Sequence, residues 1–136
     1  MRVQQLILKN RADIDAVLAP LAAMQPQLVL VFGACAYFST PELTAALRRQ
    51  LPGAVIAGCS TAGEIAGKRV YDGSCVITAI SFAHTAVAIA DAIICDMADS
   101  HEAGQRLAQA LPQDGLAAVF MLGTGVAING SALIAG

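Results

Sequence analysis

Charged and aromatic residues are scarce in this chain of 136 residues: 13% are charged, 4% are aromatic, and there is no tryptophan. A typical soluble domain has about 25% charged residues. Eight Lys and Arg against ten Asp and Glu give a net charge of −2. This balance excludes a strongly basic protein, so we expect no nucleic-acid partner. The 57% hydrophobic content supplies a core and excludes a disordered chain.

Long apolar runs are also lacking. A membrane-spanning helix needs about 20 apolar residues, whereas the longest run, 116–128, is shorter and contains Gly123, Thr124 and Gly125. The N-terminus lacks the pattern of a signal peptide. We therefore predict a cytoplasmic protein with no membrane insertion and with reduced cysteines. None of the four cysteines has C-x-x-C spacing, which argues against a zinc ribbon and leaves no metal site to predict.

Apolar periodicity predicts an alternation of strands and helices. Continuous apolar runs predict strands, and spacing of i, i+3, i+4, i+7 predicts helices. The predicted strands are 3–8, 28–32, 54–57, 75–82, 86–94 and 116–122. The predicted helices begin near Asn10, Ser39, Asp99 and Asn129, with Asn10, Ser39 and either Asp99 or Ser100 as N-caps. Pro20 predicts a kink or an early end of the first helix.

The order of these elements predicts the fold class. We expect an α/β domain with a mixed, mostly parallel sheet and helices on both faces. The link 83–85 is short enough only for an antiparallel hairpin between 75–82 and 86–94. The final predicted helix has a single turn before Gly136 and would not be stable alone. We therefore expect that 1–136 is one domain truncated at its C-terminal end.

Small residues follow three of the predicted buried strands, at Gly33, Gly58 and Gly123. If these strands are parallel, the three turns lie on one rim at their carboxyl ends, where open α/β sheets bind ligands. Backbone amides and hydroxyl groups there suit a carboxylate or phosphate, and Glu64 suits a cation such as an amino group. Tight turns that merely require glycine are the alternative. The candidate ligand-binding residues are Gly58, Cys59, Ser60, Thr61, Gly63, Glu64 and Thr124.

Two other chemistries have candidate residues. Ser60 lies in a sequence similar to the G-x-S-x-G nucleophile elbow of serine hydrolases, but Ala62 stands where the second glycine belongs. Asp91 or Asp96, followed by His101, would complete the hydrolase order. His84 is a candidate axial haem ligand, because a single imidazole can hold haem iron; an exposed turn histidine is the alternative.

The segments 28–33, 52–65 and 72–74 resemble the N-terminal part of the FIST domain. Within them, 58–64 (GCSTAGE) matches the signature of that family closely and is the most specific element. Residues 122–130 resemble a later strand and turn of the family, with a partial departure at the first glycines. The resemblance covers nearly the whole chain. It implies that the rest of this domain and a C-terminal FIST region are missing.

The resemblance also implies a function. FIST domains are sensory input modules that are thought to bind small ligands such as amino acids and to signal to kinases and other output proteins. One branch comprises haemoproteins that sense nitric oxide and regulate a histidine kinase. The expected protein is therefore a ligand-binding sensor without enzymatic activity and without a cofactor. A haem-based sensor and a serine hydrolase are the alternatives.

Overall fold

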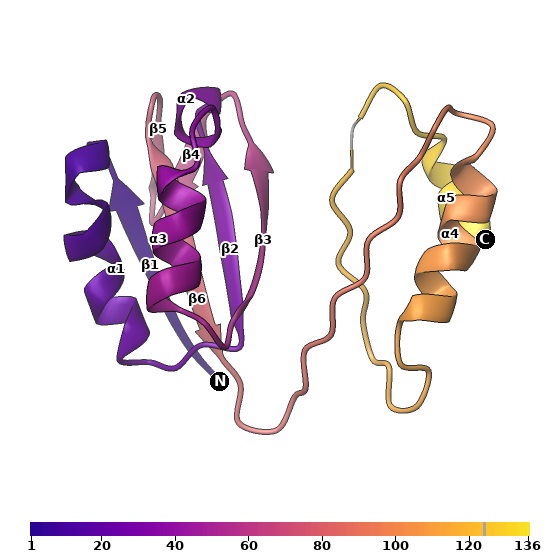
Figure 1. Ribbon diagram of the computed structural model, residues 1–136, viewed down its shortest axis with the longest axis horizontal. Helices are drawn as coiled ribbons and strands as arrows, with labels where there is room; N and C mark the ends of the chain where they lie inside the picture. Colours follow the sequence, from indigo (N-terminus) through magenta and orange to yellow (C-terminus); the bar gives the residue numbers. More distant parts are fainter. Residues whose placement is uncertain (124) are drawn as a thin grey trace. The chain divides into compact units, whose positions relative to one another are not determined.

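The computed structural model describes residues 1–123 and 125–136, which form two compact units, Met1–Val87 and Ala88–Gly136. Figure 1 shows the elements of both units. Unit 1 contains β1 (Arg2–Leu8), η1 (Arg11–Asp13), α1 (Ile14–Ala22), β2 (Leu28–Gly33), α2 (Cys35–Phe38), α3 (Glu42–Gln50), β3 (Val55–Ser60), β4 (Glu64–Ala66), β5 (Arg69–Tyr71) and β6 (Cys75–Ser81). Unit 2 contains α4 (Ser100–Ala110) and α5 (Gly130–Ala135).

The main sheet of unit 1 has the strand order β1-β6-β2-β3. Strand β6 is antiparallel to both β1 and β2, whereas β2 and β3 are parallel. The fold is thus mixed α/β, as predicted, but the prediction of a mostly parallel sheet is wrong. The apolar runs of β2 and β3 indicated their parallel pairing correctly. They carried no information about the strand that lies on the other side of β2.

The predicted hairpin between 75–82 and 86–94 is also wrong. Strand β6 has β1 on one side and β2 on the other, so both of its edges are already paired. Residues 86–94 lie in neither a helix nor a strand, and the same is true of the predicted strand 116–122. An apolar run becomes a strand only where a neighbouring strand accepts its backbone hydrogen bonds. Among the described residues of unit 2, no strand offers that pairing.

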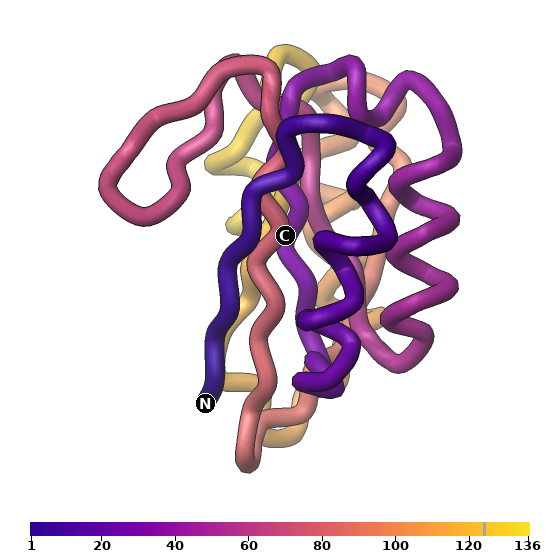
Figure 2. Tube along the Cα trace, turned by 90° about the vertical axis from the view of Figure 1, so that its left-hand side faces the viewer, coloured from indigo at the N-terminus to yellow at the C-terminus, as the bar shows by residue number. Residues whose placement is uncertain are grey.

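One face of the main sheet carries the hydrophobic core. Helices α1 and α3 both lie on this face (Figure 2), so within unit 1 the expected helices on both faces are not found. The Tyr37 hydroxyl donates a 3.0 Å hydrogen bond to the Leu8 carbonyl within this core. The core residues, all nearly inaccessible to solvent, are Leu8, Ile14, Leu18, Leu21, Val29, Val31, Tyr37, Leu43, Ala46, Leu47, Leu51, Cys75, Ile77 and Ala79.

Two of the predicted helix starts behave differently. The side chain of Asn10 accepts a hydrogen bond from the Ala12 amide, which confirms the predicted cap. The Ser39 hydroxyl instead donates to the Ala36 carbonyl at 2.8 Å, and α3 begins after Pro41 with no side-chain cap. The cap prediction at Ser39 is wrong because the unpredicted turn α2 occupies the residues just before it.

Unit 2 is built on the close packing of α4 and α5. A side chain at Gly104 of α4 would place its Cβ 2.1 Å from the Leu133 carbonyl oxygen, so the close contact requires glycine. The buried Ser100 hydroxyl accepts a 3.0 Å hydrogen bond from the Asn129 amide at the start of α5. The Asn129 side chain in turn caps the Ala132 amide, so the predicted helix start is confirmed.

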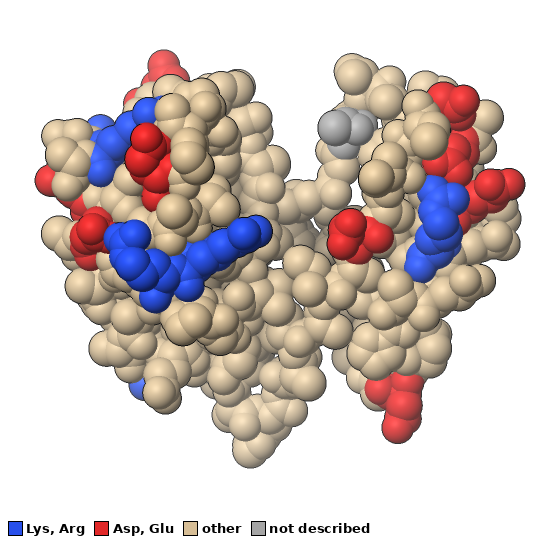
Figure 3. Space-filling model, in the orientation of Figure 1, with Lys and Arg blue, Asp and Glu red and all other residues tan. Residues whose placement is uncertain are grey.

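The outside of the molecule reflects its low charge. Figure 3 shows small groups of charged side chains separated by wide uncharged areas on the face in view. None of the helices in the described ranges has the length and apolar character needed to cross a membrane.

Candidate functional site

The predicted rim exists at the ends of β2 and β3. Gly33 lies opposite Ser60 in the parallel register, and the Thr61 amide donates a 2.9 Å hydrogen bond to the Gly33 carbonyl. Two of the three predicted turns are therefore adjacent. The third turn is not found at a strand end: Gly123 and Gly125 lie in unit 2, and Thr124 lies outside the described residues.

The end of β3 offers unpaired backbone groups to solvent. Gly58, Cys59 and Ser60 are exposed, and among the described residues β3 is an edge strand with β2 as its neighbour. The amides of Val55 and Thr61 point toward β2. Because amide directions alternate along a strand, those of Gly58 and Ser60 point to the open side. This end of the strand can therefore donate two amides and a hydroxyl to a bound anion.

The two glycines in this strand-end region differ in the space around them. A Cβ at Gly58 would lie 1.9 Å from the Val31 carbonyl oxygen, so the pairing of β2 with β3 requires glycine there. A Cβ at Gly63 would make only an ordinary 3.5 Å contact with the Tyr71 carbonyl oxygen. Gly58 thus has a packing role whether or not it also contacts a ligand.

Glu64 is the most constrained residue of the predicted set. Its side chain is only 2% exposed, and its carboxylate accepts three hydrogen bonds. The Thr61 hydroxyl donates to Oε1 at 2.9 Å, while the Ser74 hydroxyl and amide donate to Oε2 at 2.7 and 3.2 Å. Burial acts to raise the pKa of Glu64, but the hydrogen bonds from Ser74 and Thr61 outweigh it and lower this pKa below its usual value. Glu64 is therefore an ionised, buried anchor that joins the rim to the start of β6.

Sequence reasoning missed the short hairpin that follows this anchor. Strands β4 and β5 pair antiparallel, with Ile65 opposite Val70, and Gly67 turns the chain between them with a φ of +58°. Two short apolar stretches around a Gly-containing turn are the signal that would have revealed it. The hairpin brings Ser74 within reach of Glu64, so the site depends on two strands that were not among those predicted.

His84, Asp96 and His101, which were proposed for the alternative chemistries, are all exposed. His84 is exposed in the link after β6. The haem hypothesis stays a prediction. The Asp96 carboxylate accepts hydrogen bonds from the amides of Ala98 and Asp99, and the exposed His101 ring lies 3.4 Å from the Gln105 amide group.

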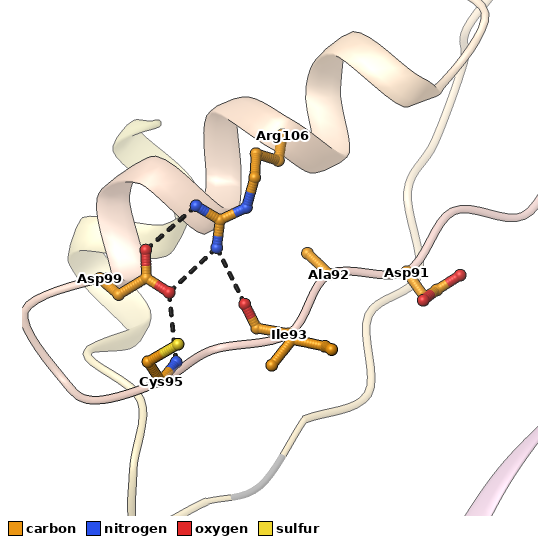
Figure 4. A pocket seen from close by; sticks show the side chains of 6 residues that line it. All are labelled: Asp91, Ala92, Ile93, Cys95, Asp99 and Arg106. Carbon is orange, nitrogen blue, oxygen red and sulfur yellow. Dashed lines mark hydrogen bonds and ion pairs between the residues drawn. The ribbon is translucent and has the colours of Figure 1, made fainter.

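Unit 2 has an open depression of about 650 Å³ beside α4. Figure 4 shows that Arg106 and Asp99 in its lining bind each other and nearby backbone groups, whereas no interaction is drawn at the Asp91 side chain. The Arg106 guanidinium donates to both carboxylate oxygens of Asp99, at 3.1 and 3.0 Å, and to the Ile93 carbonyl at 2.9 Å. The hydrogen bond from Arg106 also lowers the pKa of Asp99. This cluster ties the segment before α4 to the helix. A second depression, of about 360 Å³, lies between α1 and α3 in unit 1.

A comparison with protein families decides the identity of the chain. The model of the FIST N domain matches residues 27–136. This protein is a member of the FIST N family. The match includes the strand end at Gly58–Ser60, the Glu64 anchor and both strands of the hairpin. No curated protein and no solved structure matches the chain.

The family gives the site a context. A FIST domain is a sensory domain of signalling proteins.

Proposed function

We propose that this FIST domain binds a small molecule of the amino-acid type at the carboxyl ends of β2 and β3. The ligand-binding residues would be Gly58, Cys59, Ser60, Thr61, Gly63 and Glu64; Thr124, the remaining predicted residue, lies outside the described part of the chain. The 2.9 Å contact between Thr61 and Glu64, at the exposed end of β3, is the observation that carries this proposal. The role is binding rather than catalysis.

Two halves of the ligand would meet different groups. The open amides of Gly58 and Ser60, with the Ser60 hydroxyl, suit a carboxylate. An ammonium group would take the place of the Thr61 hydroxyl on Glu64 Oε1, the carboxylate oxygen that has a single protein donor among the described hydrogen bonds. Because Oε2 of the same carboxylate holds Ser74, this exchange would disturb the contact that anchors the hairpin. Ligand binding would thereby change the structure at the base of the hairpin.

The experiment is a calorimetric titration with the free amino acids, each paired with the acid that lacks its amino group. We expect at least one amino acid to bind more tightly than its deaminated analogue. Loss of a charged partner costs on the order of 2–5 kcal/mol of binding, so Glu64→Gln should abolish the preference for the amino group. Ser60→Ala should weaken both compounds of a pair by roughly tenfold, the value of one hydrogen bond to a charged group.

Matched substitutions elsewhere supply the control. Ser131→Ala and Thr85→Ala remove exposed hydroxyls outside the rim and should leave every affinity unchanged. A Glu64→Gln variant that keeps the full preference for the amino group would remove Glu64 from the binding site. Equal affinities of the amino acids and their analogues for the wild type would refute the ligand class itself.

We also propose that the signal passes to a separate output protein, such as a histidine kinase, in the cytoplasm. The family supports the signalling role in general terms. The particular partner and the location are predictions from the sequence.

A further inference from the structure

The outer edge of β3 carries unpaired backbone groups. Among the described residues β3 pairs with β2 alone, and it lies at one end of the strand order of the main sheet (Figure 1). The amides of Val55 and Thr61 point toward β2. Because backbone directions alternate along a strand, the amides and carbonyls of Ile56, Gly58 and Ser60 point outward. These outward backbone groups are named the β3 edge below.

The opposite edge of the main sheet is protected, whereas the β3 edge is not. Natural proteins protect exposed strand edges with charged side chains, proline or a covering element. Strand β1 begins with Arg2 and is followed by Lys9, and its Gln5 side chain accepts a 3.0 Å hydrogen bond from the Gly67 amide in the turn of the β4–β5 hairpin. Strand β3 contains neither a charged residue nor a proline. The sequence therefore leaves this edge free to pair with another strand.

The β3 edge is complementary to itself. Its three residues are evenly spaced about Gly58, so a second copy can approach antiparallel with the two-fold axis at that glycine. Ile56 then lies opposite Ser60 of the second copy, and every outward amide meets an outward carbonyl of the other strand. Charge does not oppose this approach, because residues 50–63 contain no charged side chain.

The side chains beside the edge favour a second copy over a foreign strand. Domains that select a foreign extended segment gain affinity from main-chain hydrogen bonds and specificity from pockets for alternate side chains. Between the outward residues of β3 lie Ala57 and Cys59, which are too small to form the walls of such pockets. Recognition at this edge therefore rests on the backbone, and symmetry gives a second copy the identical edge.

We infer that two copies of this domain associate through the β3 edge and join their main sheets across a two-fold axis at Gly58. The pairing places Ala57 opposite Cys59 of the second copy. A standard interface uses about 20–30 residues on each side, whereas β3 has six. The association should therefore be reversible and should depend on the protein concentration.

A small molecule at the rim would compete with this association. The open amides of Gly58 and Ser60 are the donors assigned above to the carboxylate of a ligand, and they cannot serve the ligand and the second copy together. Ligand binding would therefore separate the two copies and convert the input signal into a change of oligomeric state. This competition rests on the proposed function, whereas the pairing of the edges does not.

Disulfide cross-linking tests the register. Ala57→Cys places a new thiol opposite Cys59 of the second copy, at a non-hydrogen-bonded pair whose Cα atoms are about 4.5 Å apart, which suits a disulfide. Oxidation with copper phenanthroline should convert this variant into a covalent dimer on a non-reducing gel. The control Ala57→Cys/Cys59→Ser keeps the new thiol and the exposed Cys35 and Cys95. It lacks the opposing thiol and should give at least about tenfold less dimer.

Sedimentation equilibrium under reducing conditions tests the noncovalent association. Ser60→Pro removes an outward amide from each copy, at an edge position where a strand accepts proline. It should raise the dissociation constant of the dimer at least about tenfold, because two hydrogen bonds are lost by symmetry. Thr85→Pro, in the exposed link after β6, is the matched control and should change this constant by less than about twofold.

Several results would overturn the inference. A wild type that stays monomeric up to about 0.5 mM would exclude the dimer, since even weak specific interfaces associate in that range. Equal cross-linking of the Ala57→Cys variant and its Cys59→Ser control, or an unchanged dissociation constant in Ser60→Pro, would exclude pairing through the β3 edge. Efficient cross-linking of the wild type through Cys59 would place the two-fold axis at Cys59 and refute the register.

Two further measurements keep the test decisive. Circular dichroism establishes that each variant is folded, and if Ser60→Pro unfolds, the cross-linking pair decides alone. Sedimentation is repeated with any amino acid that binds the rim. A bound amino acid that leaves the dimer intact would refute the competition. A rim that binds no amino acid, with the dimer unchanged, would refute only the proposed function.

Discussion

Removal of the Glu64 carboxylate is the sharpest test of how this FIST domain holds its hairpin. Glu64→Ala would leave the Ser74 amide and hydroxyl without their acceptor, in a residue that is 3% exposed. A buried donor without a partner costs about 1–3 kcal/mol. Release of the buried charge from its unfavourable surroundings offsets a part of this loss. We expect a decrease of about 3 kcal/mol in the free energy of unfolding.

Glu64→Gln should be much milder. The glutamine amide keeps one oxygen for the two Ser74 donors, and its NH₂ group can donate to the Thr61 hydroxyl, which then acts as an acceptor. The three contacts lose only their charge assistance, so we expect a decrease of about 1 kcal/mol. Glu102→Gln, an exposed first-turn residue of α4, is the control and should show at most a few tenths of a kcal/mol.

Urea unfolding followed by far-ultraviolet circular dichroism measures these differences, since the chain has no tryptophan. A double-mutant cycle with Ser74→Ala isolates the contact itself. A coupling free energy of about 1.5 kcal/mol or more is expected for side chains in one hydrogen-bond network. Additive single effects would show that Ser74 does not depend on Glu64, and the account of the anchor would then be wrong.

The pH dependence follows from the lowered pKa of Glu64 in the folded state. The unfolded chain binds a proton on this carboxylate more readily than the folded chain does. Its contribution is therefore fully present above the unfolded pKa, about 4.3, and is lost as the pH falls through the lowered folded pKa. The stability difference between the wild type and Glu64→Gln should shrink below pH 4.3. A difference that grows on acidification would mean that the buried carboxyl is protonated in the folded protein.

Two further outcomes are expected. Gly58→Ala should lower the free energy of unfolding by more than about 2 kcal/mol because its Cβ would overlap the Val31 carbonyl oxygen, whereas Gly53→Ala, with open space around its Cβ, should be nearly neutral in the same urea assay. A thiol reagent at pH 8 should modify three of the four cysteines in the folded protein; Cys75 is buried, with its pKa raised to about 12 by burial, and should react only after unfolding. Slow reaction of all four, or reaction of Cys75 at the rate of the others, would contradict this assignment.

Local patterns predicted the parts of the fold that depend on local forces. The runs that became β2 and β3 are continuously apolar and end in glycine, so their parallel pairing and common rim could be inferred. Helices α3 and α4 follow from apolar spacing. The position of β6 could not be inferred, because its partners lie far away along the chain and a strand pattern does not name its neighbours.

The position of Ser60 and Thr61 at the end of a strand could be predicted, but the contacts of Glu64 could not. Ser60 and Thr61 lie at the strand end that their position after a buried strand indicated. The burial of Glu64 was not foreseen, because a charged residue in a Gly-rich stretch ordinarily stays in water. Its burial depends on the hairpin folding back so that Ser74 supplies two donors, a contact across ten residues that no periodicity encodes.

Because β6 lies between β1 and β2, the main sheet cannot assemble until β6 has been synthesised. Residues 2–8 and 28–33 leave the ribosome long before residues 75–81, yet both strands need that last strand as their common neighbour. The entropy of closing so long a loop is lost before the stabilising contacts between the strands form, and this slows folding. Until Ser81 has emerged, the nascent chain therefore carries two strands whose edges lack this neighbour. Early synthesis is consequently the stage at which this domain most needs protection from aggregation.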